Sequence, residues 1–215
     1  MMKQLLSMLF GTALLLCLIS GAVAQAQNTT FHANGAFAVA GPCSQSGTIQ
    51  TCLFVNVSRG STTGTASQTS TSLFYDISIS DSSTGSFQAL IGSGTIPNSA
   101  FQVQSQADSL NVDTSTLDPA LFQNSTCTPD PSNPIFLLCV PSLGGLVSGT
   151  WQRVPSEGGS TTGTSEFHSP GAKFTSTGTS HFNVALANLS VLGQTGTDSN
   201  AEIGINHNTT INISH

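Results

Sequence analysis

The sequence predicts an all-β protein, either an antiparallel β-sandwich or a Greek-key or jelly-roll-like barrel. Three observations predict this class. Apolar and polar residues alternate repeatedly with the period of two that marks half-buried strands. Clusters of Gly, Ser, Asn and Pro separate these short stretches, and no sustained helical period follows the first 26 residues. Short strands joined by such turns are typical of sandwiches and barrels.

The clearest strand covers positions 73–80, where apolar residues at 73, 75, 77 and 79 alternate with polar residues at 76, 78 and 80. A turn is expected at 81–85, and residues 87–91 return as the partner strand. The apolar residues on both faces of 181–191 predict a central strand packed on both sides. Pro119 near a helix start predicts a helical turn within 116–123. Further strands are predicted at 31–40, 49–57, 100–107, 135–140, 149–154, 201–205 and 209–213.

Two stretches rich in Ser, Thr and Gly, 59–71 and 156–169, are expected to form long loops. Each contains the hexapeptide Gly-Ser-Thr-Thr-Gly-Thr, at 60–65 and at 159–164. The repeat suggests a duplicated β-meander with two pseudo-symmetric halves. Coincidence in a low-complexity background is the alternative. The proline-rich segment 128–134 is expected to be a rigid loop, because proline disrupts helices and central strands.

Residues 1–26 have the form of a secretory signal peptide. A basic start at Lys3 precedes an apolar run, and small residues then give Ala-x-Ala exits at 22–24 and 24–26. Cleavage is predicted after Ala24 or Ala26, which leaves 27–215 as a single β-rich domain. An uncleaved membrane anchor is the alternative, but the apolar run is short for a span of about 20 residues. We therefore expect a secreted protein, or a periplasmic one in a bacterium.

Charge is scarce, at 7% of residues against roughly 25% in an ordinary domain. Loss of Lys3 with the signal leaves 4 − 1 = 3 basic residues against 10 acidic ones, a net charge of 3 − 10 = −7. Three basic residues are too few to form a phosphate-binding patch. We therefore expect no nucleic-acid partner. No apolar run after the signal is long enough to span a membrane. The partner is instead expected to be an extracellular or cell-surface ligand.

Four cysteines follow the signal, and an even count in an exported chain predicts two disulfides. Three pairings are possible. Short loops between predicted strands favour Cys43–Cys52 and Cys127–Cys139. The Cys-x-x-Cys spacing of a zinc site is absent.

Few residues are candidates for ligand or metal binding. Trp151 and Arg153 are the candidate ligand contacts if the Trp is exposed, since ring faces pack on sugar faces. A core Trp anchoring a strand is the favoured alternative. Glu166 and His168 share a face of an extended segment, and with His181 they are weak candidates for a metal site or an acid–base pair. Solvated side chains are the favoured interpretation of these three, so we expect neither a metal nor a cofactor.

Paired carboxylates roughly 5–10 Å apart would indicate a glycoside hydrolase. Solvated carboxylates without a catalytic role are the favoured interpretation. The candidate pairs are Asp76 with Asp81, Asp108 with Asp113, and Glu157 with Glu166.

No strong catalytic motif is present in the sequence. The sequence therefore favours an exported, non-catalytic β-sandwich module with a binding or structural role at the cell surface or outside the cell. The alternatives are an extracellular polysaccharide hydrolase and a His-based metal-binding module.

Overall fold

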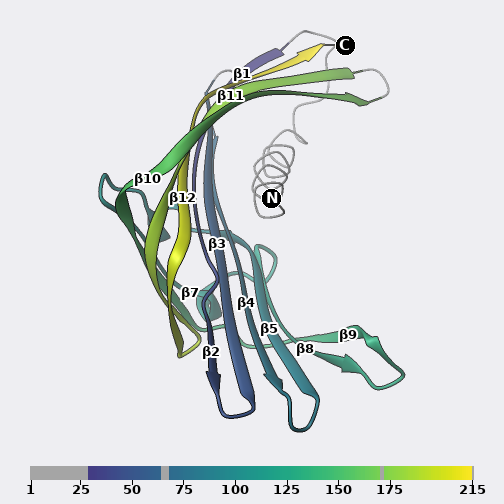
Figure 1. Cartoon of the computed structure of the whole chain (residues 1–215). Coiled ribbons are helices and arrows are strands. Elements are labelled where there is room, and N and C mark those ends of the chain that lie inside the picture. The colour runs from purple at the N-terminus through teal and green to yellow at the C-terminus, as the bar shows by residue number, and fades with distance from the viewer. Residues whose placement is uncertain (1–28, 64–67, 170–171, 215) are drawn as a thin grey trace.

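The computed structural model describes residues 29–63, 68–169 and 172–214, and these form one large antiparallel sheet with two short 3-10 helices (Figure 1). The all-β prediction is confirmed. The strands are β1 (Thr29–Ala40), β2 (Cys43–Ser46), β3 (Ile49–Thr63), β4 (Gln68–Asp81), β5 (Ser86–Ile96), β6 (Phe101–Gln102), β7 (Ala107–Asp113), β8 (Phe122–Asp130), β9 (Asn133–Pro141), β10 (Leu146–Ser169), β11 (Ala172–Val191) and β12 (Gln194–Ser214). The helices are η1 (Asn98–Ala100) and η2 (Thr114–Thr116).

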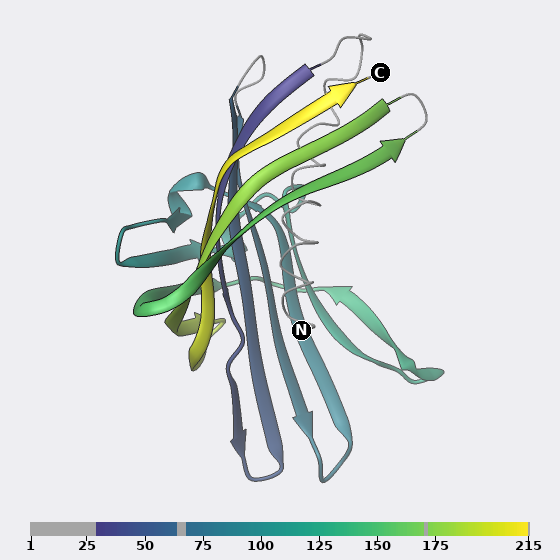
Figure 2. The same cartoon turned by 45° about the horizontal axis from the view of Figure 1, so that its top comes forward.

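The order of the sheet is β6-β7-β10-β11-β12-β1-β3-β4-β5-β8-β9, and β2 pairs with β3 outside this path. In the described chain the sheet is open, because β6 and β9 are its two ends. It bends strongly, and β1, β10, β11 and β12 sweep together beyond the rest at one end (Figure 2). The β2–β3 and β4–β5 hairpins extend at the opposite end, and the β8–β9 hairpin projects to the side (Figure 1).

One face of the bent sheet carries the core. Val55 pairs with Tyr75 and Val57 pairs with Leu73, so these side chains stand on the same face. Both halves of the sheet contribute to one buried cluster, in which a fully buried large side chain contributes roughly 1.5–3 kcal/mol. Its largest fully buried members are Trp151, Tyr75, Phe101, Leu73, Ile77 and Ile203.

A polar link crosses this core between β4, β8 and η2. The Tyr75 hydroxyl donates to Asn124 Oδ1 at 2.6 Å. Thr114 Oγ1 donates to the carbonyl oxygen of Gly145 at 3.0 Å and lies 3.3 Å from Asn124 Oδ1. Buried polar groups with such partners avoid the cost of desolvation, and this link holds the loop after β7 against the sheet.

The prediction of long loops at 59–71 and 156–169 is wrong. β3 continues to Thr63, β4 begins at Gln68, and β10 runs through the second stretch to Ser169. Neighbouring threonines pair across β10 and β11, with Thr162 Oγ1 3.0 Å from Thr179 Oγ1. The first hexapeptide lies at the end of β3, where residues 64 and 65 fall outside the described chain, and the second lies inside β10. The duplication stays a prediction.

Two further expectations differ from the structure. Positions 98–113 hold η1, β6 and β7 rather than one strand at 100–107. The proline-rich loop is instead part of the β8–β9 hairpin. Its prolines are tolerated because β9 lies at the sheet edge and β8 beyond Cys127 pairs only with β9. A turn does form near 118–121, where the Leu121 N–H donates to the Asp118 carbonyl oxygen.

The strand predicted at 181–191 lies inside the sheet, between β10 and β12, as expected. It is fully buried on one face only. Ala185, Ala187, Leu189 and Val191 are buried, whereas on the other face Phe182 and Val184 are half-buried and Leu186 is exposed.

The disulfides follow the favoured pairing, Cys43–Cys52 and Cys127–Cys139. Each joins directly opposed residues of neighbouring strands. The register also connects the two pairs through Ser78 and Ala89, which lie between Cys52 and Cys127. Both disulfides therefore lie in one transverse row across the sheet, on the face opposite Tyr75. We call this the disulfide row.

The signal peptide predicted at 1–26 lies outside the described residues, and its cleavage and the single domain stay predictions. Neither helix in the described ranges has the length and hydropathy of a bilayer-crossing helix.

Candidate functional site

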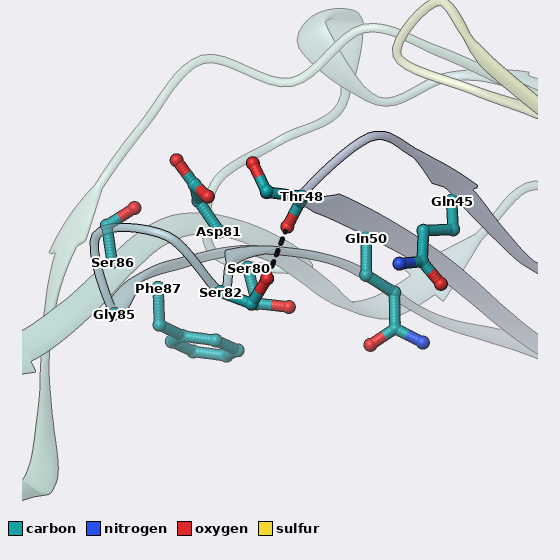
Figure 3. A pocket seen from close by; sticks show the side chains of 9 residues that line it. All are labelled: Gln45, Thr48, Gln50, Ser80, Asp81, Ser82, Gly85, Ser86 and Phe87. Carbon is teal, nitrogen blue, oxygen red and sulfur yellow. Dashed lines mark hydrogen bonds between the residues drawn. The ribbon is translucent and has the colours of Figure 1, made fainter.

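A hollow of about 330 Å³ lies at the tips of the β2–β3 and β4–β5 hairpins (Figure 3). We call it the hairpin-tip pocket. Hydroxyl and amide groups dominate its wall, with one carboxylate and one aromatic ring. The lining residues are Gln45, Thr48, Gln50, Ser80, Asp81, Ser82, Gly85, Ser86 and Phe87.

Two tight turns build the pocket. The β2–β3 turn includes Gly47 and the β4–β5 turn includes Gly85, both at positive φ, where glycine has no steric penalty. Asp81 Oδ1 accepts the backbone N–H of Ser83 at 2.9 Å, which fixes the start of the second turn. The Ser82 N–H donates to the Thr48 carbonyl oxygen at 3.0 Å, so the two turns are tied to each other.

The strand register places the wall of the pocket on one face. Gln50 pairs with both Gln45 and Ser80, and Ser80 pairs with Phe87. These four residues form the row next to the disulfide row, two residues nearer the hairpin tips. The Cys43–Cys52 disulfide therefore fixes the strand pair that carries the two glutamine amides.

Asp81 gives the pocket a negative charge that is present at neutral pH. Hydrogen bonds from the Ser83 hydroxyl and N–H, and then from Thr48, lower the pKa of Asp81 to about 2. Bonds that favour the ionised form have this effect. Asp81 thus accepts hydrogen bonds but cannot act as a proton donor near neutral pH.

Trp151 is fully buried, so the favoured interpretation as a core Trp holds and the exposed ligand contact is wrong. Its cross-strand neighbour Asp108 is also fully buried. Arg153, the other candidate contact, lies near this carboxylate, with Nη2 3.7 Å from Asp108 Oδ1. Burial raises the pKa of Asp108, while the Gln104 N–H and the Arg153 charge oppose that rise. Arg153 thus offsets only part of the desolvation of this buried acid.

The predicted histidine site is only partly assembled. His168 Nε2 lies 3.9 Å from Glu166 Oε2, and Lys173 Nζ lies 3.0 Å from Glu166 Oε1. His181 pairs with Ser160 instead, eight residues along β11 from Lys173, a separation of about 26 Å. Within the described ranges no three His, Cys, Asp or Glu side chains gather as a metal site.

The three carboxylate pairs are not brought together. Asp76 and Asp81 lie five residues apart on β4, and Asp108 and Asp113 lie five apart on β7. An odd spacing puts side chains on opposite faces. Glu157 and Glu166 lie nine residues apart on β10, or about 30 Å along a strand.

Comparison with known proteins gives no relative to guide the interpretation. No family model, no curated protein and no solved structure matches this chain. The function must therefore be inferred from the geometry of its own residues.

The sequence did not indicate the hairpin-tip pocket. It predicted the turn at 81–85, but the pocket also needs the β2–β3 turn beside it, and this depends on the β3–β4 register. The solvated state expected for Asp76 and Asp108 is wrong as well. Asp108 is buried, and Asp76 is half-buried between Phe54 and Ile91 on the neighbouring strands.

Replacing Asp76 should stabilise the protein in a pH-dependent way. Burial raises the pKa of Asp76 above 3.8. Between 3.8 and that raised pKa the folded state keeps a proton that the unfolded state has lost, so stability falls as pH rises through this window. Above the raised pKa, Asp76 is ionised in the folded state and the full destabilisation by its buried charge is present. Asp76→Asn should therefore raise Tm at pH 7 and have little effect at pH 3.

Thermal unfolding followed by circular dichroism at both pH values tests this prediction. Glu157→Gln, which removes an exposed carboxylate on β10, controls for the loss of one negative charge. An equal Tm change in both variants, or a larger gain for Asp76→Asn at pH 3, would contradict the assignment.

Proposed function

We propose that the protein is an exported, non-catalytic module that binds a neutral, hydroxyl-rich ligand such as a glycan in the hairpin-tip pocket. The observation that carries the proposal is the chemistry of the pocket wall. Gln45 and Gln50 offer amide donors and acceptors, and the ionised Asp81 is an acceptor. The ring of Phe87 supplies an apolar surface (Figure 3). Sugar hydroxyls and ring faces match these groups.

The distances between candidate reactive groups support a binding role over hydrolysis. Of the carboxylates considered as hydrolytic pairs, only Asp81 lines the pocket. Its low pKa also makes it unsuitable as a general acid, which must hold a proton near the working pH.

A glycan array on the purified protein, followed by titration of the strongest hit, tests the proposal. Gln50→Ala is expected to weaken binding by roughly five- to tenfold, because one hydrogen bond contributes about 1 kcal/mol. Gln88→Ala is the matched control, since Gln88 is exposed on β5 but does not line the pocket.

Three outcomes would contradict the proposal. The first is an array without hits, and the second is equal binding by the Gln50 and Gln88 variants. The third is cleavage of a bound glycan, which would favour the hydrolase.

A further inference from the structure

β9 is an uncovered edge strand with an apolar surface. Ten large apolar residues are exposed among those described, and six of them lie between positions 136 and 146. Proteins usually protect long edge strands with charges, prolines or bulges, and β9 has prolines only near its two ends, at 134 and 141. The segment 131–146 contains no charged residue. The exposed residues on β9 itself are Phe136 (63%), Leu137 (46%), Leu138 (54%) and Val140 (52%).

This apolar surface continues the core face of the sheet. The register connects Ile77 to Leu90, Leu90 to Thr126, and Thr126 to Val140. Val140 and, by alternation, Phe136 and Leu138 therefore stand on the face that carries the core. The β8–β9 hairpin projects away from the other strands (Figure 1), so no described element covers these side chains.

Two observations establish which backbone groups of β9 point to its free edge. The Ser142 N–H donates to the Asn124 carbonyl oxygen at 3.0 Å. The Cα atoms of Cys127 and Cys139 lie only 4.0 Å apart, as in the close, non-hydrogen-bonded type of antiparallel pair. Even positions of β9 therefore bond to β8. The N–H and C=O groups of Leu137 and Cys139 point outward.

We propose that β9 pairs antiparallel with β9 of a second copy of this chain, with Leu138 on the two-fold axis. In this register Leu137 of each copy faces Cys139 of the other, and each such pair exchanges both N–H···O bonds. Pro141 also points outward but has no N–H, which limits the ladder at that end. Phe136 then faces Val140 of the other copy, and Leu138 faces its own equivalent.

The lack of charge along this edge makes it the surface where a second copy meets the least repulsion. The chain carries a net charge of −6, so two copies repel each other over most contacts. The uncharged segment 131–146 is a surface where they can meet without placing like charges opposite each other. A two-fold contact is also closed, because the same edge is used by both copies.

A single cysteine on the two-fold axis tests the register. Leu138 would face its equivalent in a close, non-hydrogen-bonded pair, the same type of position that the Cys127–Cys139 disulfide occupies. Leu138→Cys should therefore form a disulfide-linked dimer under mild oxidation. Val140→Cys is the matched control, since its equivalent in the second copy would lie four residues away, or about 13 Å. Peptide mapping should show the 138–138 link with both native disulfides retained.

The mass of the uncrosslinked protein in light scattering provides an independent readout. The unaltered protein should have the mass of two chains, and Leu138→Lys should reduce it to one, because two like charges would face each other. Ile49 is also exposed, but it lies on β3, which β4, β5 and β8 separate from β9. Ile49→Lys should therefore remain a dimer. A monomeric unaltered protein, a dimer unaffected by Leu138→Lys, or equal crosslinking of the two cysteine variants would overturn the proposal.

Discussion

Trp151→Ala is expected to lower the free energy of unfolding by about 3–5 kcal/mol, the usual cost of truncating a buried Trp. The ring is fully buried. It packs so closely over Gly149 that a Cβ added to that glycine would lie 2.7 Å from the ring, and Leu189 lines the same space. Both neighbours sit in regular ladders of β10 and β11. The backbone therefore cannot collapse into the cavity.

Urea unfolding followed by far-UV circular dichroism measures this loss, since the variant has no Trp fluorescence. Trp151→Phe should lose less, because it keeps an aromatic ring and removes an indole N–H that has no hydrogen-bond partner in the described structure. Gln152→Ala, at the exposed neighbour, should change the free energy by less than about 0.5 kcal/mol. A loss below about 1 kcal/mol for Trp151→Ala would mean that the Trp is not a core residue.

Gly92→Ala is expected to destabilise the protein by about 1–3 kcal/mol or more, the cost of overpacking a filled core. An added Cβ would overlap the ring of Tyr75. That ring is fully buried, its centroid lies 6.3 Å from that of the Phe122 ring in a stacked contact, and its hydroxyl donates a hydrogen bond to Asn124. It cannot move aside without losing one of these contacts.

Gly163→Ala is the matched control, since Gly163 also lies in a paired strand but has no atom within 4 Å of an added Cβ. This change should be neutral or stabilise by up to about 1 kcal/mol. Adding Tyr75→Leu to Gly92→Ala should recover part of the loss, which a double-mutant cycle measures as a coupling energy. Additive losses in the cycle, or equal effects of the two glycine changes, would contradict the steric explanation.

The sequence predicted strands best where one face is apolar. The alternation at 73–79 located β4 and its partner β5, because burying one face requires that period. It failed at β8, whose residues 123–126 are all polar, and at the Ser/Thr/Gly-rich part of β10. In these strands the ladder depends on neighbours distant in sequence. Pairing between such segments is invisible to local patterning.

The candidate site was harder to predict for the same reason. The local disulfide pairing could be predicted, because short loops favour it. The alignment of Gln50 with Ser80 and Phe87 depends on the register of three strands. The burial of Asp108 depends on β7 lying beside β10, and the sequence did not predict β7 as a separate strand.

The disulfide row has a consequence for how the sheet responds to its chemical surroundings. One disulfide attaches β2 to β3 and the other attaches β9 to β8. β2 pairs only with β3, and β9 pairs only with β8. The strands between them have a hydrogen-bonded neighbour on each side and contribute side chains to the core. Whether β2 and β9 stay attached to this half of the sheet therefore depends on the oxidation state of the four cysteines. A reducing environment would loosen its two margins first and leave the centre in place.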